Sequence, residues 1–155
     1  MSADRAALRV ELESWLCREL GAQGLVRLCP RCGSSEHGRP VVLGAPAAAG
    51  GPPWVSLGYS DGLGVAAWTT EGPVGIDVEP VGPPVGEFGD RLTWTRTEAV
   101  LKASGTGLTD MPHELPSMWT QRLELPAGWL GTVAVAGAAH PVVSWRTAGP
   151  AAPPR

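Results

Sequence analysis

GIDVE, at residues 75–79, and WTRTEAVLK, at residues 94–102, are the two stretches that decide the fold of this chain. In an extended strand, residues two apart point to the same face. Asp77 and Glu79 should therefore project side by side from the first stretch, while the residues between them face the core. Adjacent carboxylates repel unless a cation neutralises them, and magnesium prefers such oxygen ligands together with waters and substrate phosphates. The alternative is a strand end that simply faces solvent.

The second stretch is typical of a helix start. Residues 95–98 read Thr-Arg-Thr-Glu, a capping box that predicts a helix from there to about residue 104. Glu98 and Lys102 are four residues apart and should share one helix face. They are either an ordinary surface ion pair or a third carboxylate for a metal and a cation for a phosphate. The second arrangement is what phosphoryl transfer requires, because its catalysis is mostly positioning and charge stabilisation.

The rest of the chain reads as one helix and several short strands. Apolar residues at three- and four-residue spacing predict an amphipathic helix over residues 4–20, stopped by Gly21. Turn-rich segments separate the other apolar runs, with a turn expected at 58–62. The predicted strands cover residues 25–28, 41–43, 54–57, 63–69, 74–79, 119–125, 130–136 and 141–145. We expect an N-terminal half at 1–80, a C-terminal half at 81–146 and a disordered tail at 147–155.

A CPRCG turn at residues 29–33 is a further candidate site. Two cysteines at this spacing can converge on a metal, and zinc is the natural one. His37 supplies a third ligand, but the sequence offers no second CxxC to complete a structural site. A plain loop with reduced thiols at Cys29 and Cys32 is therefore the favoured interpretation, and zinc is the alternative.

Composition excludes several classes of function. The 155 residues carry a net charge of −3 and no basic run, which argues against nucleic-acid binding. No apolar stretch approaches the length of about 18 residues needed to span a membrane. The N-terminus lacks the layout of a signal peptide, so we expect a cytoplasmic protein with reduced cysteines. No GxSxG nucleophile motif is present.

The order and spacing of these segments resemble the Sfp-type 4′-phosphopantetheinyl transferases, particularly actinobacterial ones. The similar segments are CPRCGSSEHGRPVV (29–42), VSLGYSDG (55–62), GPVGIDVE (72–79), WTRTEAVLKASGTGL (94–108) and LPAGWLGTVAVAG (125–137). The resemblance implies a shortened α+β fold with antiparallel sheets and packed helices in two pseudo-symmetric halves, and coenzyme A bound between them.

The resemblance also implies a reaction. A serine hydroxyl of an apo acyl or peptidyl carrier protein attacks the β-phosphate of coenzyme A, and 3′,5′-ADP leaves. Mapped by motif position, the magnesium ligands are Asp77, Glu79 and Glu98. Glu98 is also the expected base and Lys102 faces the phosphates. The expected coenzyme A contacts are Arg39, Arg31, Tyr59 and Ser60. Such enzymes act in secondary-metabolite biosynthesis, and a homo-oligomer is an open alternative to a monomer.

Three departures from the family pattern keep other functions open. Gly58-Tyr59-Ser60 stands where the family usually has Ser-His-Ser, and Thr97 stands where it has lysine. Only residues 80–93 connect the two carboxylate motifs, in place of a longer helical segment that helps to dock the carrier protein. The alternatives are a scaffold that now catalyses another biosynthetic step, such as a cyclisation or lyase reaction, and a non-catalytic module that binds coenzyme A or a carrier protein.

Overall fold

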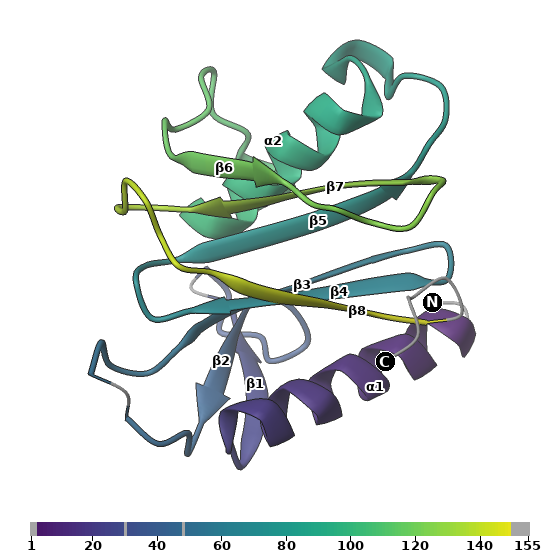
Figure 1. Ribbon diagram of the computed structural model, residues 1–155. Coiled ribbons are helices and arrows are strands. Elements are labelled where there is room, and N and C mark those ends of the chain that lie inside the picture. The colour runs from purple at the N-terminus through teal and green to yellow at the C-terminus, as the bar shows by residue number, and fades with distance from the viewer. Residues whose placement is uncertain (1–2, 30, 48, 150–155) are drawn as a thin grey trace.

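Residues 3–29, 31–47 and 49–149 are described by a computed structural model of the chain. Within them the chain forms two α-helices and three small antiparallel sheets (Figure 1). The predicted α+β class with antiparallel sheets is therefore confirmed. None of the described helices combines the length and the apolar composition that crossing a membrane would need.

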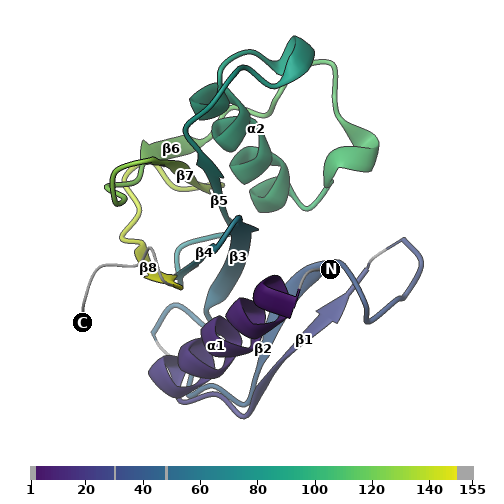
Figure 2. The same cartoon turned by 90° about the vertical axis from the view of Figure 1, so that its right-hand side faces the viewer.

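The first helix, α1 (Ala3–Leu20), covers a sheet of three strands in the order β3-β4-β8 (Figures 1 and 2). These strands are β3 (Trp54–Ser60), β4 (Leu63–Thr69) and β8 (Ser144–Ala148). Leu12 and Leu16 of α1 are completely buried in the core that this sheet provides. The apolar residues whose spacing predicted the helix thus form its buried face.

A separate hairpin follows α1. Strand β1 (Gly24–Leu28) pairs with β2 (Arg39–Leu43), with Val26 opposite Val41. The long connection between these strands carries the CPRCG turn. Figure 2 shows the hairpin extending beside α1, below the end of α2.

The second helix, α2 (Arg91–Ser104), packs on a sheet in the order β5-β7-β6 (Figure 1). Its strands are β5 (Val74–Pro80), β7 (Trp129–Val135) and β6 (Trp119–Arg122). Short 3₁₀ turns, η1 (Gly86–Phe88) and η2 (Leu108–Asp110), flank the helix. Gly75 allows this close packing, since a Cβ there would overlap the carbonyl oxygen of Ala99.

Strands β3 and β5 join the two sheets. The Ser56 hydroxyl accepts a hydrogen bond of 3.1 Å from the backbone N–H of Ile76. A Cβ at position 58 would lie only 3.1 Å from the carbonyl oxygen of Ile76, so glycine at this position allows β3 and β5 to pack closely. Strand pairing crosses residue 80: β5, which ends at Pro80, pairs with β7, and β8 returns to pair with β4.

Helix α2 begins earlier than predicted. The capping box at residues 95–98 is wrong, because the helix starts at Arg91 and Asp90 is its N-cap. The Asp90 carboxylate accepts a 2.7 Å hydrogen bond from the N–H of Thr93. Thr95 is instead buried inside the helix, and its hydroxyl contacts that of Thr132 on β7 at 2.9 Å. The local sequence pattern matched a helix cap, but in the fold Thr95 lies within the helix and packs against β7.

Several strand boundaries also differ from the prediction; the strand expected at 119–125, for example, ends at Arg122. Residues 58–60, expected in a turn, complete β3, and the turn consists of Asp61 and Gly62, both with positive φ. The strand expected at 141–145 begins only at Ser144. Thr147 and Ala148 belong to β8, so the predicted disorder is wrong for these two residues. Residues 150–155 of that predicted tail lie outside the described residues.

Candidate functional site

Strand β5 and helix α2 bring Asp77 and Lys102 together. The Lys102 ammonium donates a 2.8 Å hydrogen bond to Oδ1 of Asp77 and another of 2.9 Å to the carbonyl of Ile76. Asp77 is only 4 % exposed, and its second oxygen, Oδ2, is buried without a hydrogen-bond partner. A buried, unpartnered carboxylate oxygen is costly unless a proton or a cation reaches it.

Glu98 is the second acid of this cluster. Burial, followed by the neighbouring Asp77 carboxylate, raises the pKa of Glu98 to about 8, while Lys102 opposes the shift. Glu98 therefore carries a proton at neutral pH in the absence of another cation. Two facing carboxylates with one proton between them form a site that a divalent cation could occupy in place of that proton.

Glu79 points to a different partner. Its carboxylate forms an ion pair of 3.1 Å with Arg91 in the first turn of α2. Burial and the charge of Asp77 raise the pKa of Glu79, and Arg91 opposes this. The three expected magnesium ligands thus influence one another electrostatically, but their donor atoms are not all within 4.8 Å of each other in the described residues.

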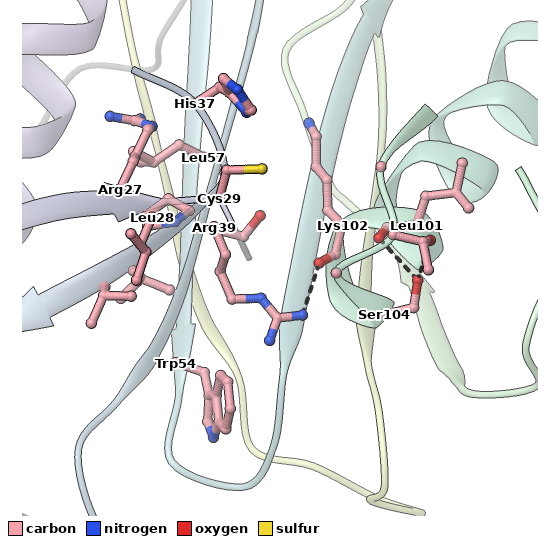
Figure 3. Close-up of a pocket in the computed structure, with 18 of the residues that line it drawn as sticks. Arg27, Leu28, Cys29, His37, Arg39, Trp54, Leu57, Leu101, Lys102 and Ser104 are labelled. Atoms are coloured by element: carbon pink, nitrogen blue, oxygen red, sulfur yellow. Dashed lines mark hydrogen bonds between the residues drawn. The ribbon is translucent and has the colours of Figure 1, made fainter. Parts of the chain in front are cut away.

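A cavity of about 920 Å³ lies beside this cluster, between the β1–β2 hairpin, β3 and the C-terminal end of α2 (Figure 3). Among the described residues, those that line it include no aspartate or glutamate but four cationic side chains, Arg27, Arg31, Arg39 and Lys102. Arg27 is paired with Glu13 of α1 at 2.8 Å. Trp54, Leu57 and other apolar side chains complete the walls. The cavity therefore suits a ligand with both apolar and anionic parts.

Arg39, one of the coenzyme A contacts that the resemblance implies, lines the cavity and reaches the end of α2. Its guanidinium donates a hydrogen bond of 2.6 Å to the carbonyl of Ala103. It donates another of 3.3 Å to the carbonyl of Lys102 (Figure 3). It also lies 5.3 Å from the centre of the Trp54 ring. Its Nε is buried without a partner, and burial lowers the pKa of Arg39. Arg39 pairs with no carboxylate among the described residues. A cation bonded to helix carbonyls also complements the C-terminal end of α2.

The other expected coenzyme A contacts are dispersed. Arg31 lines the cavity at an exposed position and forms an ion pair with Asp110 of η2. Tyr59 instead is partly buried and packs against the core beneath α1, and burial raises its pKa to about 12. Neither Tyr59 nor Ser60 is among the residues that line the cavity. Thr97 is buried, and its hydroxyl bonds to the carbonyl of Thr93 in its own helix.

The CPRCG turn converges with His37 at the same cavity. Donor atoms of Cys29, Cys32 and His37 all lie within 4.8 Å of one another, and the distance from Cys32 Sγ to His37 Nε2 is 3.3 Å. All three line the cavity. Backbone N–H groups of Cys32 and Arg31 are directed at the Cys29 sulfur and lower the pKa of its thiol.

Two wall residues were missed by sequence reasoning. Arg27 lies in a strand that was predicted correctly, and Trp54 begins another. Only the placement of hairpin β1–β2 against β3 puts both on the cavity. No local spacing could have identified them, because their neighbours come from distant parts of the chain.

Comparisons with known proteins identified no matching family model, no matching curated protein and no matching solved structure. The function of the chain must therefore be argued from the site.

Proposed function

We propose that the chain transfers 4′-phosphopantetheine from coenzyme A to a serine of an apo acyl or peptidyl carrier protein, with magnesium as the cofactor. The observation that carries this proposal is the position of Lys102. It lines the cationic cavity and also contacts Asp77 at 2.8 Å, beside Glu98. A phosphate in the cavity next to Lys102 would therefore lie close to the carboxylates. The motif resemblance supplies the reaction type.

The cavity has the chemistry that coenzyme A requires. Its volume of about 920 Å³ lies within the usual range for small-molecule sites. Arg39 and Lys102 offer charge-assisted hydrogen bonds to phosphate oxygens. The Trp54 ring adjoining Arg39 provides an aromatic surface for a flat base or an apolar arm.

The carboxylate cluster fits a magnesium ion. Asp77 has a buried Oδ2 without a hydrogen-bond partner, and Glu98 holds a proton because burial, and then the Asp77 carboxylate, raise its pKa to about 8. These two residues would hold the ion, and Glu79 would join them on release from Arg91. Bound there, magnesium would stabilise charge on the phosphate oxygens during transfer.

The chain's own residues would then act as follows. Glu98, deprotonated, accepts the proton of the carrier serine as the serine oxygen forms a bond to the β-phosphorus of coenzyme A. The bond from that phosphorus to the oxygen it shares with the α-phosphate breaks, and 3′,5′-ADP leaves with the bonding electrons. Lys102 stabilises charge on the phosphates. Because Glu98 has a pKa of about 8, the metal-free protein is poorly prepared for this step at neutral pH.

Mass spectrometry of the carrier tests this function directly. The protein is incubated with coenzyme A, magnesium and several apo carrier proteins, and the mass gain of phosphopantetheine is measured. We expect the gain with the native chain and a loss of at least about 100-fold in rate for Glu98→Gln, the usual scale for a general base. Glu124→Gln, at an exposed glutamate, is the matched control and should keep full activity. Absence of the gain on every carrier would refute the proposal.

The placement of Thr97 and Tyr59 favours one further candidate. Neither Thr97 nor Tyr59 lines the cavity among the described residues, so neither supplements the cations Arg39 and Lys102 there. Such a pocket could bind a ligand without transferring its phosphoryl group. Isothermal titration of coenzyme A distinguishes the cases: binding without transfer supports a non-catalytic module, and no binding supports a scaffold that acts on another biosynthetic intermediate.

A further inference from the structure

Three metal-ligand side chains meet in the connection between β1 and β2. Donor atoms of Cys29, Cys32 and His37 lie within 4.8 Å of one another. Zinc binds sulfur at about 2.3 Å and nitrogen at about 2.0 Å, so ligands of a tetrahedral ion lie about 3.5–3.8 Å apart. The 3.3 Å from Cys32 Sγ to His37 Nε2 is close to that spacing before any ion is bound.

The backbone that follows Cys29 forms a closed turn. The N–H of Gly33 donates to the Cys29 carbonyl at 2.9 Å, which closes the turn, and Gly33 adopts a left-handed φ of 69°. The closed turn keeps Cys29 and Cys32 on one tight loop, where both sulfurs can reach one ion.

The close approach of Gly38 to the end of β1 positions His37. Gly38 has a φ of 107°, and a Cβ there would lie 2.6 Å from the Leu28 carbonyl carbon. Glycine is therefore required at this point for the returning chain to approach the end of β1. This contact brings His37 beside Cys29, and Figure 3 shows the two side chains at one end of the cavity.

We propose that Cys29, Cys32 and His37 bind one zinc ion, whose fourth coordination position opens into the cavity. No fourth histidine, cysteine or acidic side chain joins this group among the described residues. All three ligands line the cavity, so the open position faces the space where a ligand would bind. Three protein ligands with one exchangeable position are characteristic of zinc sites that act on a ligand, and thiolate is the donor class that such an ion favours. This site does not depend on the proposed transfer of phosphopantetheine.

Cobalt substitution tests the site. The full chain, kept reduced with a phosphine, is titrated with Co²⁺ and then with Zn²⁺. We expect one metal ion per chain, thiolate-to-cobalt charge-transfer absorption, strong tetrahedral d–d bands, and displacement of cobalt by one equivalent of zinc. A weak octahedral spectrum, or no retained metal after gel filtration, would overturn the proposal.

The third cysteine provides a matched control. Cys17 lies on α1 and outside the group, so Cys17→Ser should bind cobalt as the native chain does. Cys32→Ser should weaken binding at least 100-fold and lose most of the charge-transfer absorption. His37→Ala replaces an exposed side chain, so its fold should persist, as circular dichroism can verify, while the tetrahedral bands are lost. Equal losses in Cys17→Ser and Cys32→Ser would contradict the assignment.

The open position has its own readout. Addition of 2-mercaptoethanol to the cobalt form should intensify the charge-transfer absorption, because a third thiolate binds the ion. The same addition to Cys17→Ser should have the same effect. An unchanged spectrum would show that the fourth position is closed, and would overturn that half of the proposal.

Discussion

Glu98 shows how strongly one residue depends on its surroundings. On an isolated helix it would be an ordinary glutamate paired with Lys102. In the fold, Lys102 bonds to Asp77 and to a main-chain carbonyl, and Glu98 adjoins the Asp77 carboxylate. The pKa of Glu98 therefore rises to about 8, mainly because the side chain is buried. The Glu98–Lys102 ion pair that the i,i+4 spacing suggests is replaced by an ion pair between Lys102 of α2 and Asp77 of β5.

The raised pKa predicts the direction of pH-dependent stability. Between pH 4.5 and about 8, the folded chain keeps a proton on Glu98 that the unfolded chain has released. The free energy of unfolding must therefore fall as pH rises through this window. We expect the melting temperature to be several degrees lower at pH 8.5 than at pH 5.5, measured by circular dichroism.

Variants and magnesium isolate the contribution of Glu98. Glu98→Gln should flatten the pH dependence, while the exposed control Glu124→Gln should leave it unchanged. Magnesium at pH 8.5 should raise the melting temperature of the native chain but not of Glu98→Gln, because the ion replaces the lost proton. An equal pH slope in Glu98→Gln and the native chain would rule out this account.

At the scale of elements, the contact between α2 and β5 decides the site geometry. Asp77 is on the strand, whereas Glu98 and Lys102 are on the helix, so their separation depends on how closely the two elements pack. Gly75 permits this approach, and Asp90 caps the helix that carries both side chains. Gly75 and Asp90 can be read from the sequence, but the backbone atoms that they contact cannot.

Gly75→Ala tests this packing. The added methyl would overlap the Ala99 carbonyl and lie 2.6 Å from the Ala103 nitrogen, both backbone atoms that cannot rotate away. We expect a loss of about 3 kcal/mol in the free energy of unfolding in urea, at the upper end for overpacking. Gly24→Ala is the matched control, because nothing lies within 4 Å of a Cβ there. Similar losses in both variants would contradict the packing argument.

At the scale of the whole molecule, the sheets are interleaved along the chain. After β4 the chain leaves the α1-covered sheet, β5 pairs with β7, and β8 later returns to pair with β4. Arg39 further ties the β1–β2 hairpin to the end of α2. Neither sheet can therefore form without segments from both sides of residue 80.

This interleaving predicts a single cooperative unfolding transition. Trp15 and Trp68 contact each other on the α1 side, with ring centres 5.2 Å apart, and Trp94 contacts Phe88 beside α2. Fluorescence of Trp94→Phe and of Trp15→Phe should report the two regions in different proportions. For each variant, the urea midpoint from fluorescence should equal the urea midpoint from far-ultraviolet circular dichroism. Separate transitions would show that the regions unfold independently.

The sequence by itself predicted helix α1 and the cores of most strands, because periodicities of two or about 3.6 residues depend only on neighbours along the chain. The α+β class was implied by the motif resemblance. The sequence also identified the residues of the carboxylate cluster and the CPRCG turn as chemically notable. The start of α2 was wrong because Thr95 satisfied a local pattern but is buried against Thr132.

Only the tertiary structure decided which partners these residues have. It pairs Lys102 with Asp77, Glu79 with Arg91, and Arg39 with the end of α2, and it places Tyr59 in the core beneath α1. Burial then sets the charge of Glu98, which no spacing in the sequence encodes. The physical reason is that the burial of apolar faces determines which elements pack together. Buried polar groups then form hydrogen bonds or ion pairs with the groups that this packing brings near, because leaving them unpaired is costly.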